Sequence, residues 1–152
     1  MATEAYAEMF GFLKKHDVEL FPIVEGQLFQ NGEPLEGVEI IREATYDDVE
    51  TETTVTGVSG HFAFPRWRAR SNTPGKPLVE ARLRQVVAAR YQGEFYILWQ
   101  YTTDQIAPEP MIADLLGRLD CDIANEQADY YFPISDSPGF EHIIGSICKL
   151  KP

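Results

Sequence analysis

The chain has 152 residues, of which 44% are hydrophobic and 12% aromatic. A chain of this length typically folds as one domain and buries a core without metals or disulfides. Its 24 acidic residues outnumber 13 lysines and arginines, and the resulting net charge of −11 disfavours direct binding to nucleic acid or to an anionic membrane.

The first predicted element is a helix over residues 2–15. Its apolar residues lie at i, i+3, i+4 and i+7 and form one stripe: Tyr6, Met9, Phe10 and Leu13. The N-terminus lacks the basic start and apolar run of a secretory signal peptide, and no apolar stretch approaches the ~20 residues that cross a bilayer. We therefore expect a helical segment over residues 1–17, a β domain over residues 18–152, a cytoplasmic location and no membrane span.

From Val18 onward the pattern is that of β-strands. Asn31-Gly32 lies between two apolar stretches, and both residue types tolerate the positive φ angles of a type I′ turn, so a tight hairpin is predicted there. Residues 44–52 are acidic and predict a loop or a frayed strand. Residues 66–78 are basic, rich in turn formers, and predict a loop. Further short strands are predicted over residues 51–56, 61–64 and 79–84.

An aromatic strand is predicted over residues 95–101. Its odd-numbered residues alternate onto one face that we expect in the core: Phe95, Ile97, Trp99 and Tyr101. In the strand before it, the alternation slips at Val86-Val87, which predicts a β-bulge. Pro110 suits the first turn of a short helix over residues 111–116. The last strands are predicted over residues 119–123, 130–134 and 141–150.

Many short strands with regular turn signals are typical of a sandwich or barrel. The predicted fold class is therefore all-β, an antiparallel β-sandwich with the N-terminal helix and one short additional helix. Part of the chain resembles the carboxypeptidase-regulatory-like, or transthyretin-like, superfamily over about residues 24–65. The resemblance rests on a glycine before the first hairpin strand, a Gly-x-Pro hairpin, a threonine-rich strand and a Phe-x-Phe strand: Gly26, Gly32–Val38, Thr53–Thr56 and Phe62–Phe64.

Most of the chain is also similar to a family of small bacterial proteins known as a domain of unknown function. The similarity rests on a Met-Phe-Gly-Phe-like start at residues 9–12 and a Tyr-x-Gly-x-x-Tyr-x-x-Trp segment at residues 91–99. This family implies no activity. The transthyretin-like superfamily includes an enzyme that hydrolyses hydroxyisourate, but the Tyr-Arg-Gly-Ser-like end of that enzyme is absent from residues 148–152, so we do not expect this activity.

No catalytic or metal-binding motif is recognisable in the sequence. The three histidines, His16, His61 and His142, lack ligand spacing and are expected at the surface or half-buried. Cys121 and Cys148 form no CxxC motif; we expect both to be buried and reduced, with a single bridge as the alternative in an exported protein. No cofactor is predicted, and we expect that the protein is not an enzyme.

Charge is distributed unevenly along the chain. Residues 17–52 hold eleven acids and one base, residues 66–90 hold seven bases and one acid, and residues 101–142 hold nine acids and one base. One interpretation is a set of solvated strand faces; the other is an acidic surface that attracts a cationic protein, since opposite charge speeds association. Asp120 and Asp122 alternate onto one outward face, where a weak calcium site is conceivable and a solvated surface is the commoner outcome.

Trp67 lies between Arg66 and Arg68 in the basic loop, either as a binding hot spot or as a cap on the core edge covered by an arginine. The residues predicted to bind a partner are accordingly Asp47, Asp48, Glu50, Trp67, Asp120 and Asp122. The predicted function is non-catalytic protein binding, most concretely as an immunity-type inhibitor of a cationic bacterial toxin that acts in the cytosol. The alternative is a structural or carbohydrate-binding β-sandwich module.

Overall fold

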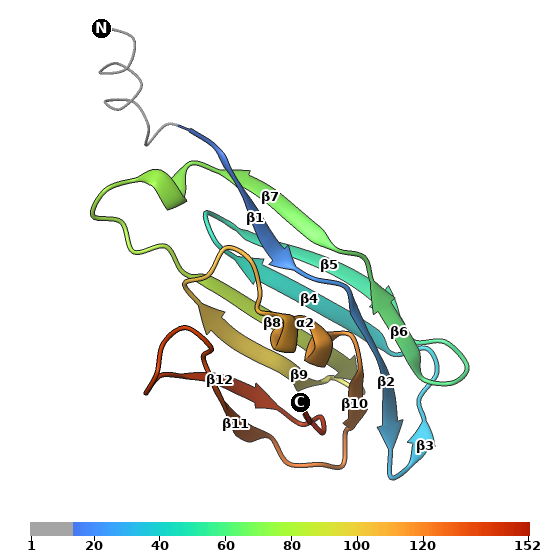
Figure 1. Ribbon diagram of the computed structural model, residues 1–152. Helices are drawn as coiled ribbons and strands as arrows, with labels where there is room; N and C mark the ends of the chain where they lie inside the picture. Colours follow the sequence, from blue (N-terminus) through green and yellow to red (C-terminus); the bar gives the residue numbers. More distant parts are fainter. Residues whose placement is uncertain (1–13) are drawn as a thin grey trace, which may run out of the picture.

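The computed structural model describes residues 14–152, which form two layers of β-structure (Figure 1). The helix predicted over residues 2–15 lies almost entirely outside the described residues. His16 and Asp17, which we assigned to the helical segment, begin the first strand, β1. The all-β, sandwich-like prediction is confirmed, and the described part contains one short α-helix.

The larger layer is a six-stranded antiparallel sheet with the order β11-β12-β9-β8-β4-β5. Its strands are β4 (Glu39–Thr45), β5 (Val49–Val55), β8 (Leu83–Tyr91), β9 (Glu94–Thr103), β11 (Ala128–Pro133) and β12 (Glu141–Ser146). Figure 1 shows the remaining elements on the near side of this sheet. The six-stranded sheet therefore has an inner face that is covered by these elements and an outer face that points away from them.

The second layer consists of two small sheets and a helix. Its elements are β1 (His16–Phe21) paired with β7 (Trp67–Ser71), β2 (Val24–Gln30) paired with β3 (Glu33–Pro34), β6 (His61–Phe64) and β10 (Leu119–Asp122), and the helix α2 (Pro110–Leu116). β10 runs parallel to β2, so the prediction of a wholly antiparallel fold is wrong at this strand. Between β2 and β10 the chain passes through the six-stranded sheet and α2, and β10 then returns beside β2 in the same direction. Parallel pairing requires a long connection of this kind.

The core between the layers contains a fully buried charge. The side chain of Arg42 on β4 is 0% exposed, and its guanidinium lies over three aromatic rings, at 5.3 Å from the centroid of Phe21, 4.7 Å from Phe64 and 4.9 Å from Trp67. Arg42 also donates to the carboxylate of Glu52 on β5 and to the Pro65 carbonyl oxygen at 2.6 Å.

The partners of Arg42 come from all three sheets. Burial lowers the pKa of Arg42, while the hydrogen bond and the charge of Glu52 raise it. A buried cation is tolerated when it is paired and hydrogen-bonded, and stacked aromatic faces attract it further. Arg42 therefore links the six-stranded sheet to both sheets of the second layer.

Several local predictions are confirmed. Asn31 and Gly32 have φ angles of 50° and 82° and form the tight turn between β2 and β3. Pro110 occupies the first turn of α2, whose buried residues are Ile112, Leu115 and Leu116. The register of β8 against β9 does shift between Val87 and Ala88, but the bulge predicted at Val86-Val87 is misplaced, because the extra residue lies in the partner strand β9.

This bulge corrects the prediction for the aromatic strand. Val87 pairs with Trp99 but Ala88 pairs with Ile97, so Leu98 is an extra residue in β9. Trp99 and Tyr101 point into the core as predicted, whereas Phe95 is 62% exposed and Ile97 is only half-buried. An extra residue reverses the alternation of side chains, and the residues before the bulge therefore point outward.

Three boundaries also differ from the predictions. The basic loop predicted over residues 66–78 contains a strand, β7, because pairing with β1 overrides its turn-rich composition. The strand predicted over residues 79–84 begins only at Leu83. The acidic stretch 44–52 forms the turn between β4 and β5 together with the strand ends on either side of it.

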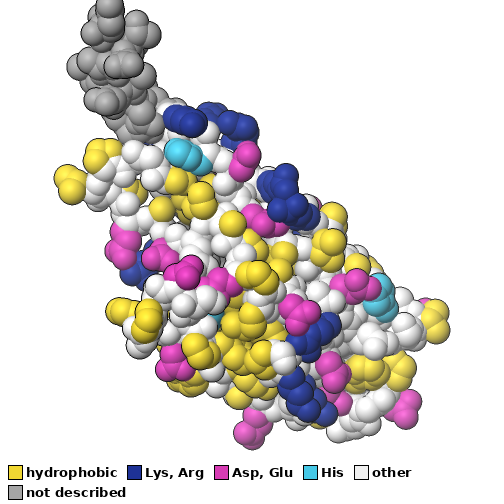
Figure 2. Space-filling model, in the orientation of Figure 1, with side chains coloured by type: hydrophobic (Ala, Val, Ile, Leu, Met, Phe, Trp, Pro, Cys, Tyr) yellow, Lys and Arg dark blue, Asp and Glu magenta, His cyan; other side chains and the backbone are white. Residues whose placement is uncertain are grey.

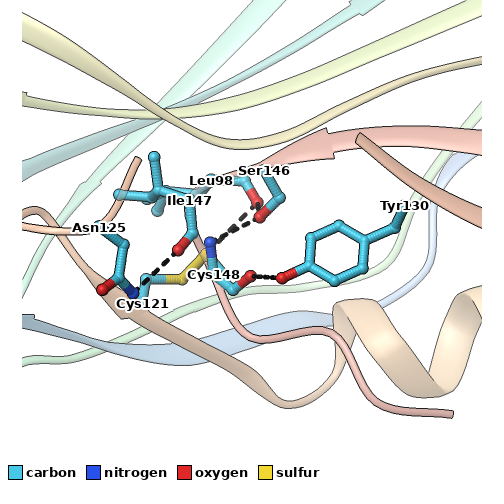
Figure 3. The surroundings of a disulfide bond; sticks show 7 residues. All are labelled: Leu98, Cys121, Asn125, Tyr130, Ser146, Ile147 and Cys148. Carbon is cyan, nitrogen blue, oxygen red and sulfur yellow. Dashed lines mark hydrogen bonds between the residues drawn. A yellow bond between two sulfur atoms is a disulfide. The ribbon is translucent and has the colours of Figure 1, made fainter. Parts of the chain in front are cut away.

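A disulfide joins Cys121 of β10 to Cys148 near the C-terminus (Figure 3). The prediction of reduced cysteines is therefore wrong; the predicted burial is right, since both are at most 1% exposed. The sequence did not reveal the pair because 27 residues separate the cysteines, and only the folded chain places them on facing backbone segments. Hydrogen bonds surround the bond: the Ser146 hydroxyl accepts from the Cys148 N–H at 2.8 Å, and the Tyr130 hydroxyl donates to the Cys148 carbonyl oxygen at 2.9 Å.

We expect the disulfide to contribute strongly to stability, since it closes a long loop in the unfolded chain. For a separation of 27 residues the loop-closure estimate is about 3–4 kcal/mol. The double variant Cys121→Ala/Cys148→Ala should therefore unfold roughly 10 °C below the wild type in calorimetry. Wild-type protein treated with a reducing agent should shift similarly; an unchanged melting temperature in both samples would contradict the assignment.

Replacing Arg42 tests its role between the layers. Arg42→Ala leaves a void among three aromatic rings and should lower the free energy of unfolding by about 2–4 kcal/mol, measured by urea denaturation. Arg84→Ala, which removes an arginine paired with Glu43 on the outer face, should cost about 0.5 kcal/mol or less. Arg42→Met separates packing from charge: if it is as stable as the wild type, the side-chain volume of Arg42 matters and its charge does not.

Candidate functional site

The six residues predicted to bind a partner do not form one site. Asp47, Asp48 and Glu50 lie at the turn between β4 and β5, whereas Asp120 and Asp122 lie on β10 beside the turn between β2 and β3. Figure 1 shows these two turns at opposite ends of the molecule. The fold therefore does not bring these residues together into a single partner-binding surface.

Two of the aspartates have structural roles. Asp47 accepts a hydrogen bond from the Thr73 hydroxyl, and this bond, with a second from Ser71, lowers the pKa of Asp47. Asp122 accepts from the backbone N–H groups of Asn31 at 3.0 Å, Gly32 at 2.9 Å and Ala124 at 2.9 Å. Its carboxylate thus fixes the hairpin turn to β10.

The surroundings of Asp122 also bear on the predicted calcium site. Asp120 and Asp122 line a hollow of about 230 Å³ that Lys149 also lines. Burial raises the pKa of Asp122, but the three backbone N–H groups and the charge of Lys149 outweigh it, so the pKa is lowered. Across residues 14–152, no group of three or more His, Cys, Asp or Glu side chains is placed to hold a metal ion.

Trp67 caps the edge of the core. Its ring stacks on Phe21 with a centroid distance of 6.3 Å and covers the guanidinium of Arg42. These contacts match the interpretation of Trp67 as a cap covered by an arginine, with the arginine supplied by β4 rather than by its neighbours in the chain; its role as a binding hot spot stays a prediction.

The face that carries α2 has charges of both signs around a central apolar area (Figure 2). A groove of about 560 Å³ on this side is lined by the apolar residues Pro22, Ile23 and Pro108. Ion pairs of Arg66 with Glu19 and of Arg118 with Asp114 lie at the same groove. Because each cation is matched by a neighbouring acid, this face offers no large excess of one charge.

The outer face of the six-stranded sheet is the largest uncovered element of the fold. Five large apolar side chains on it are more than half exposed: Val49 62%, Val55 60%, Phe95 62%, Tyr131 57% and Ile143 54%. The strand registers place Thr53, Ile41, Ala88 and Ile97 in one row across its middle. We call these nine residues the outer-face patch. The charged residues Glu39, Glu43, Arg84 and Arg90 lie among them on the same face. Exposed apolar side chains on an uncovered sheet face are candidates for contact with a partner.

At one end of the outer face, β9 and β12 separate. Their pairing is limited to Ile144 with Tyr101 and Gly145 with Gln100, and beyond it the two strands diverge. Two hollows of about 350 and 370 Å³ lie there and share Tyr101, Thr102 and Glu141. We call them together the β9–β12 cleft; further residues that line it are Arg82, Thr103, Asp104, Asp129, Phe140 and His142.

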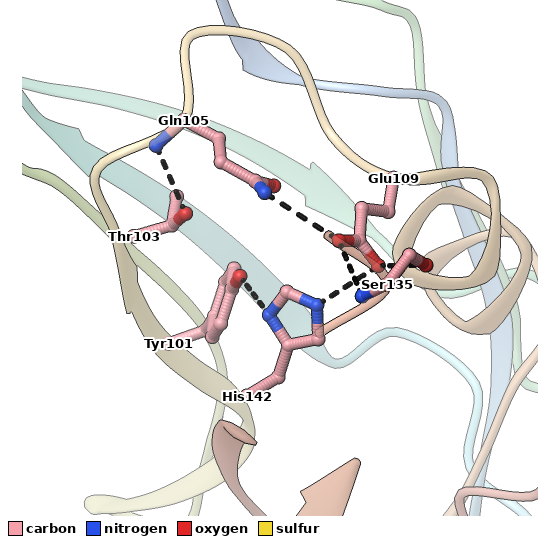
Figure 4. A network of polar contacts seen from close by, with 6 residues as sticks. All are labelled: Tyr101, Thr103, Gln105, Glu109, Ser135 and His142. Atoms are coloured by element: carbon pink, nitrogen blue, oxygen red, sulfur yellow. Dashed lines mark hydrogen bonds and ion pairs between the residues drawn. The ribbon is translucent and has the colours of Figure 1, made fainter. Parts of the chain in front are cut away.

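A buried polar network forms the inner wall of this cleft (Figure 4). The Tyr101 hydroxyl lies 2.6 Å from Nδ1 of His142, and Nε2 of His142 lies 3.1 Å from a carboxylate oxygen of Glu109. Glu109 in turn accepts from the backbone N–H and the hydroxyl of Ser135. His142, at 2% exposed, is therefore deeply buried, which corrects the expectation of a surface or half-buried histidine.

The protonation of the network follows from its partners. Burial raises the pKa of Glu109, but hydrogen bonds from His142, Gln105 and Ser135 outweigh it and lower the pKa, so Glu109 is an ionised acceptor. Nε2 of His142 therefore donates a hydrogen bond to Glu109, and Nδ1 is left as the acceptor for the Tyr101 hydroxyl. Burial raises the pKa of Tyr101 despite an opposing hydrogen bond with Thr103, which keeps the phenol neutral.

The arrangement of hydroxyl, imidazole and carboxylate is of the kind that activates nucleophiles. Here each polar group is hydrogen-bonded to another, and Tyr101 is only 4% exposed. The network instead anchors the segments around Glu109 and Ser135 to the six-stranded sheet. A sequence signal for it existed: His142 alternates with Ile144 and Ser146 in β12 and therefore faces the core.

Comparison with known proteins gives one match. A family model described as a domain of unknown function (DUF6795) matches residues 24–126. No curated protein and no solved structure matches the chain. The matched segment runs from β2 to just beyond β10 and includes β9, whereas β11 and β12 follow it.

Removing the Asp122 carboxylate tests its role at the hairpin. Asp122→Ala leaves three backbone N–H groups without their acceptor and should lower the free energy of unfolding by about 1–2 kcal/mol. Asp120→Ala, which alters the exposed neighbour on the same strand, should change it by about 0.5 kcal/mol or less. Equal effects of the two substitutions would contradict the assignment.

The same pair of variants tests the pH dependence. Since the pKa of Asp122 is lowered by folding, its contribution is present at neutral pH and is lost as the pH falls through the folded-state pKa. Urea denaturation at neutral and acidic pH should therefore show a smaller acid-induced loss of stability for Asp122→Ala than for the wild type or Asp120→Ala.

Proposed function

The chain belongs to the family of this domain of unknown function, and from its surface we propose that it is a non-catalytic protein-binding protein. The observation that carries the proposal is the outer-face patch, where five large apolar side chains are more than half exposed on one uncovered sheet face. Water contact with such a surface is unfavourable, and a partner that covers it gains about 25 cal/mol for each Å² of apolar area.

The charge of the surface supports a cationic partner. Six arginines form ion pairs with carboxylates of the same chain: Arg42, Arg66, Arg70, Arg82, Arg84 and Arg118. With acids in excess by 11 over the whole sequence, this pairing leaves most of the uncompensated charge negative. A cationic partner gains association rate and complementarity from such a surface. The most concrete version of the proposal is an immunity-type inhibitor of a cationic bacterial toxin.

The disulfide bears on where this binding takes place. Bonds such as Cys121–Cys148 persist in oxidising compartments and are rare in the cytosol. We therefore propose that the protein meets its partner in an oxidising compartment, in place of the cytoplasmic location that the sequence predicted. None of the helices among residues 14–152 has the length and apolar character that a membrane crossing requires.

We also retain the transthyretin-like superfamily as the proposed relationship of the fold, on the strength of the β2–β3 hairpin and the Phe-x-Phe strand β6.

The alternative, a carbohydrate-binding module, is supported less well. Such a site would use a row of exposed aromatic rings, and the exposed rings of the outer face are scattered. Phe95 of β9 shares its row with Arg90, whose guanidinium lies 6.0 Å from the ring centroid, whereas Tyr131 lies on the edge strand β11 and pairs with Ile143.

The proposal is tested with matched surface variants as bait. Phe95→Arg places a charge in the outer-face patch, whereas Val58→Arg places the same charge on a 79% exposed residue in the turn between β5 and β6. Wild type and Val58→Arg should retain one stoichiometric partner from lysate of the source organism. Phe95→Arg should bind that purified partner at least about tenfold more weakly in calorimetry, since interface cores exclude unpaired charge.

Two results would count against the proposal. If all three baits bind the partner equally, binding does not use the outer face. If binding by the wild type is the same at low and high salt, the electrostatic part of the argument is wrong, because screening weakens attraction between exposed charges.

A further inference from the structure

We propose that the β9–β12 cleft is the socket for one arginine side chain of the protein partner. This inference rests on the proposed function and specifies the chemistry of the partner at one end of the outer face. Its experiment uses an isolated arginine derivative, so that its outcome is independent of whether the outer-face patch binds a protein.

The cleft is built into the sheet. Because pairing of β12 with β9 stops at Ile144, the residues before it, Glu141 to Ile143, diverge from the end of β9. Hollows of about 350 and 370 Å³ open on either side of the shared residues, and each is large enough to receive a long side chain. A side chain that enters from the outer face reaches the diverging strands without displacing any element of the fold.

The charge of the lining selects a cation. Asp104, Asp129 and Glu141 contribute three carboxylates, and Arg82 is the only arginine or lysine among the lining residues. The guanidinium of Arg82 is already paired with Glu80, so it compensates the carboxylates weakly. Asp104, which directly follows β9, and Glu141, at the start of β12, line the same hollow, so both carboxylates border the space that a bound group would occupy.

The lining also favours a guanidinium over an ammonium. Phe140 borders the hollow and is 69% exposed, and an aromatic ring next to carboxylates suits a flat guanidinium that can stack and donate in its plane. The hydroxyls of Thr102 and Thr103 add neutral acceptors. An ammonium group would use the charge but lacks the flat face that stacks on a ring and the planar fork of donors.

The walls of the cleft are held in place before binding. His142 is fixed by Tyr101 and Glu109, and Glu109 holds Ser135 of the segment that leads to Phe140. A preformed site loses little conformational entropy on binding. Ile143, which lines the cleft, also belongs to the outer-face patch, so one partner can cover the patch and insert an arginine at its end. Arginine is enriched at such energetic centres of interfaces.

The test is an NMR titration of the disulfide-bonded full chain with N-acetyl-arginine amide. Saturable amide shifts are expected at residues 102–104 and 141–143. N-acetyl-citrulline amide, which has the same shape without the charge, should give no saturable shifts. N-acetyl-lysine amide should bind several-fold more weakly than the arginine derivative.

Matched variants separate the cleft from general charge. Asp104→Asn/Glu141→Gln removes two carboxylates from the cleft and should weaken binding of the arginine derivative about tenfold. Asp48→Asn/Glu50→Gln removes two carboxylates at the turn between β4 and β5 and should leave binding unchanged. Amide spectra of both variants also report whether each is folded.

Three results would overturn the inference: no saturable shifts at the cleft, equal binding of the arginine and lysine derivatives, or equal weakening by the two double variants. If any of these occurs while Phe95→Arg still abolishes binding of the protein partner, the proposed function stands and only the arginine socket is wrong. If the arginine derivative binds as expected but no protein depends on Phe95, the socket stands and the outer-face proposal fails.

Discussion

The fold depends on a buried positive charge that its two layers share. Arg42 extends from the inner face of the six-stranded sheet and meets Phe21, Phe64 and Trp67, which belong to the two small sheets of the second layer. A guanidinium has two flat faces and an edge of donors, so it can stack on rings and pair with Glu52 at the same time. No aliphatic residue combines these contacts, and the orientation of the two layers is tied to them.

The opposite end of the inner face is joined by different chemistry. There the disulfide ties β10 to the C-terminal segment, and the Tyr101–His142–Glu109 network ties the segments around α2 and β11 to the sheet. Both sets of contacts lie on the inner side. The outer face lies on the other side of the six-stranded sheet from these contacts, and its large apolar side chains remain exposed.

The bulge in β9 decides which side chains that face presents. One extra residue, Leu98, turns Phe95 and Ile97 outward while Trp99 and Tyr101 remain in the core. The cleft at the other end of the same strand arises where β12 stops pairing with β9. Two interruptions of regular pairing in one strand therefore give the outer face both its apolar patch and its polar socket. The socket combines β9, inside the family match, with β12, beyond it.

Much of the local structure was determined by the sequence alone. Asn31-Gly32, Pro110 before α2, and the alternation of Leu119, Cys121 and Ile123 predict their elements correctly, because turn angles, helix starts and strand faces depend on neighbouring residues. The strand β7 was missed, since its pairing with β1 joins residues about fifty positions apart. The local composition of β7 does not reveal that it pairs with a strand so distant in sequence.

The candidate site was decided almost wholly by tertiary structure. The sequence located the acidic residues but not their positions in space: Asp122 accepts hydrogen bonds from a hairpin turn, whereas Asp104 and Glu141 line one hollow. The pairing of Cys121 with Cys148 and the burial of His142 likewise require the folded chain. Charge and polarity are properties of a residue, but a binding site is a set of distances between residues remote in sequence, and only the packing of the two layers fixes those distances.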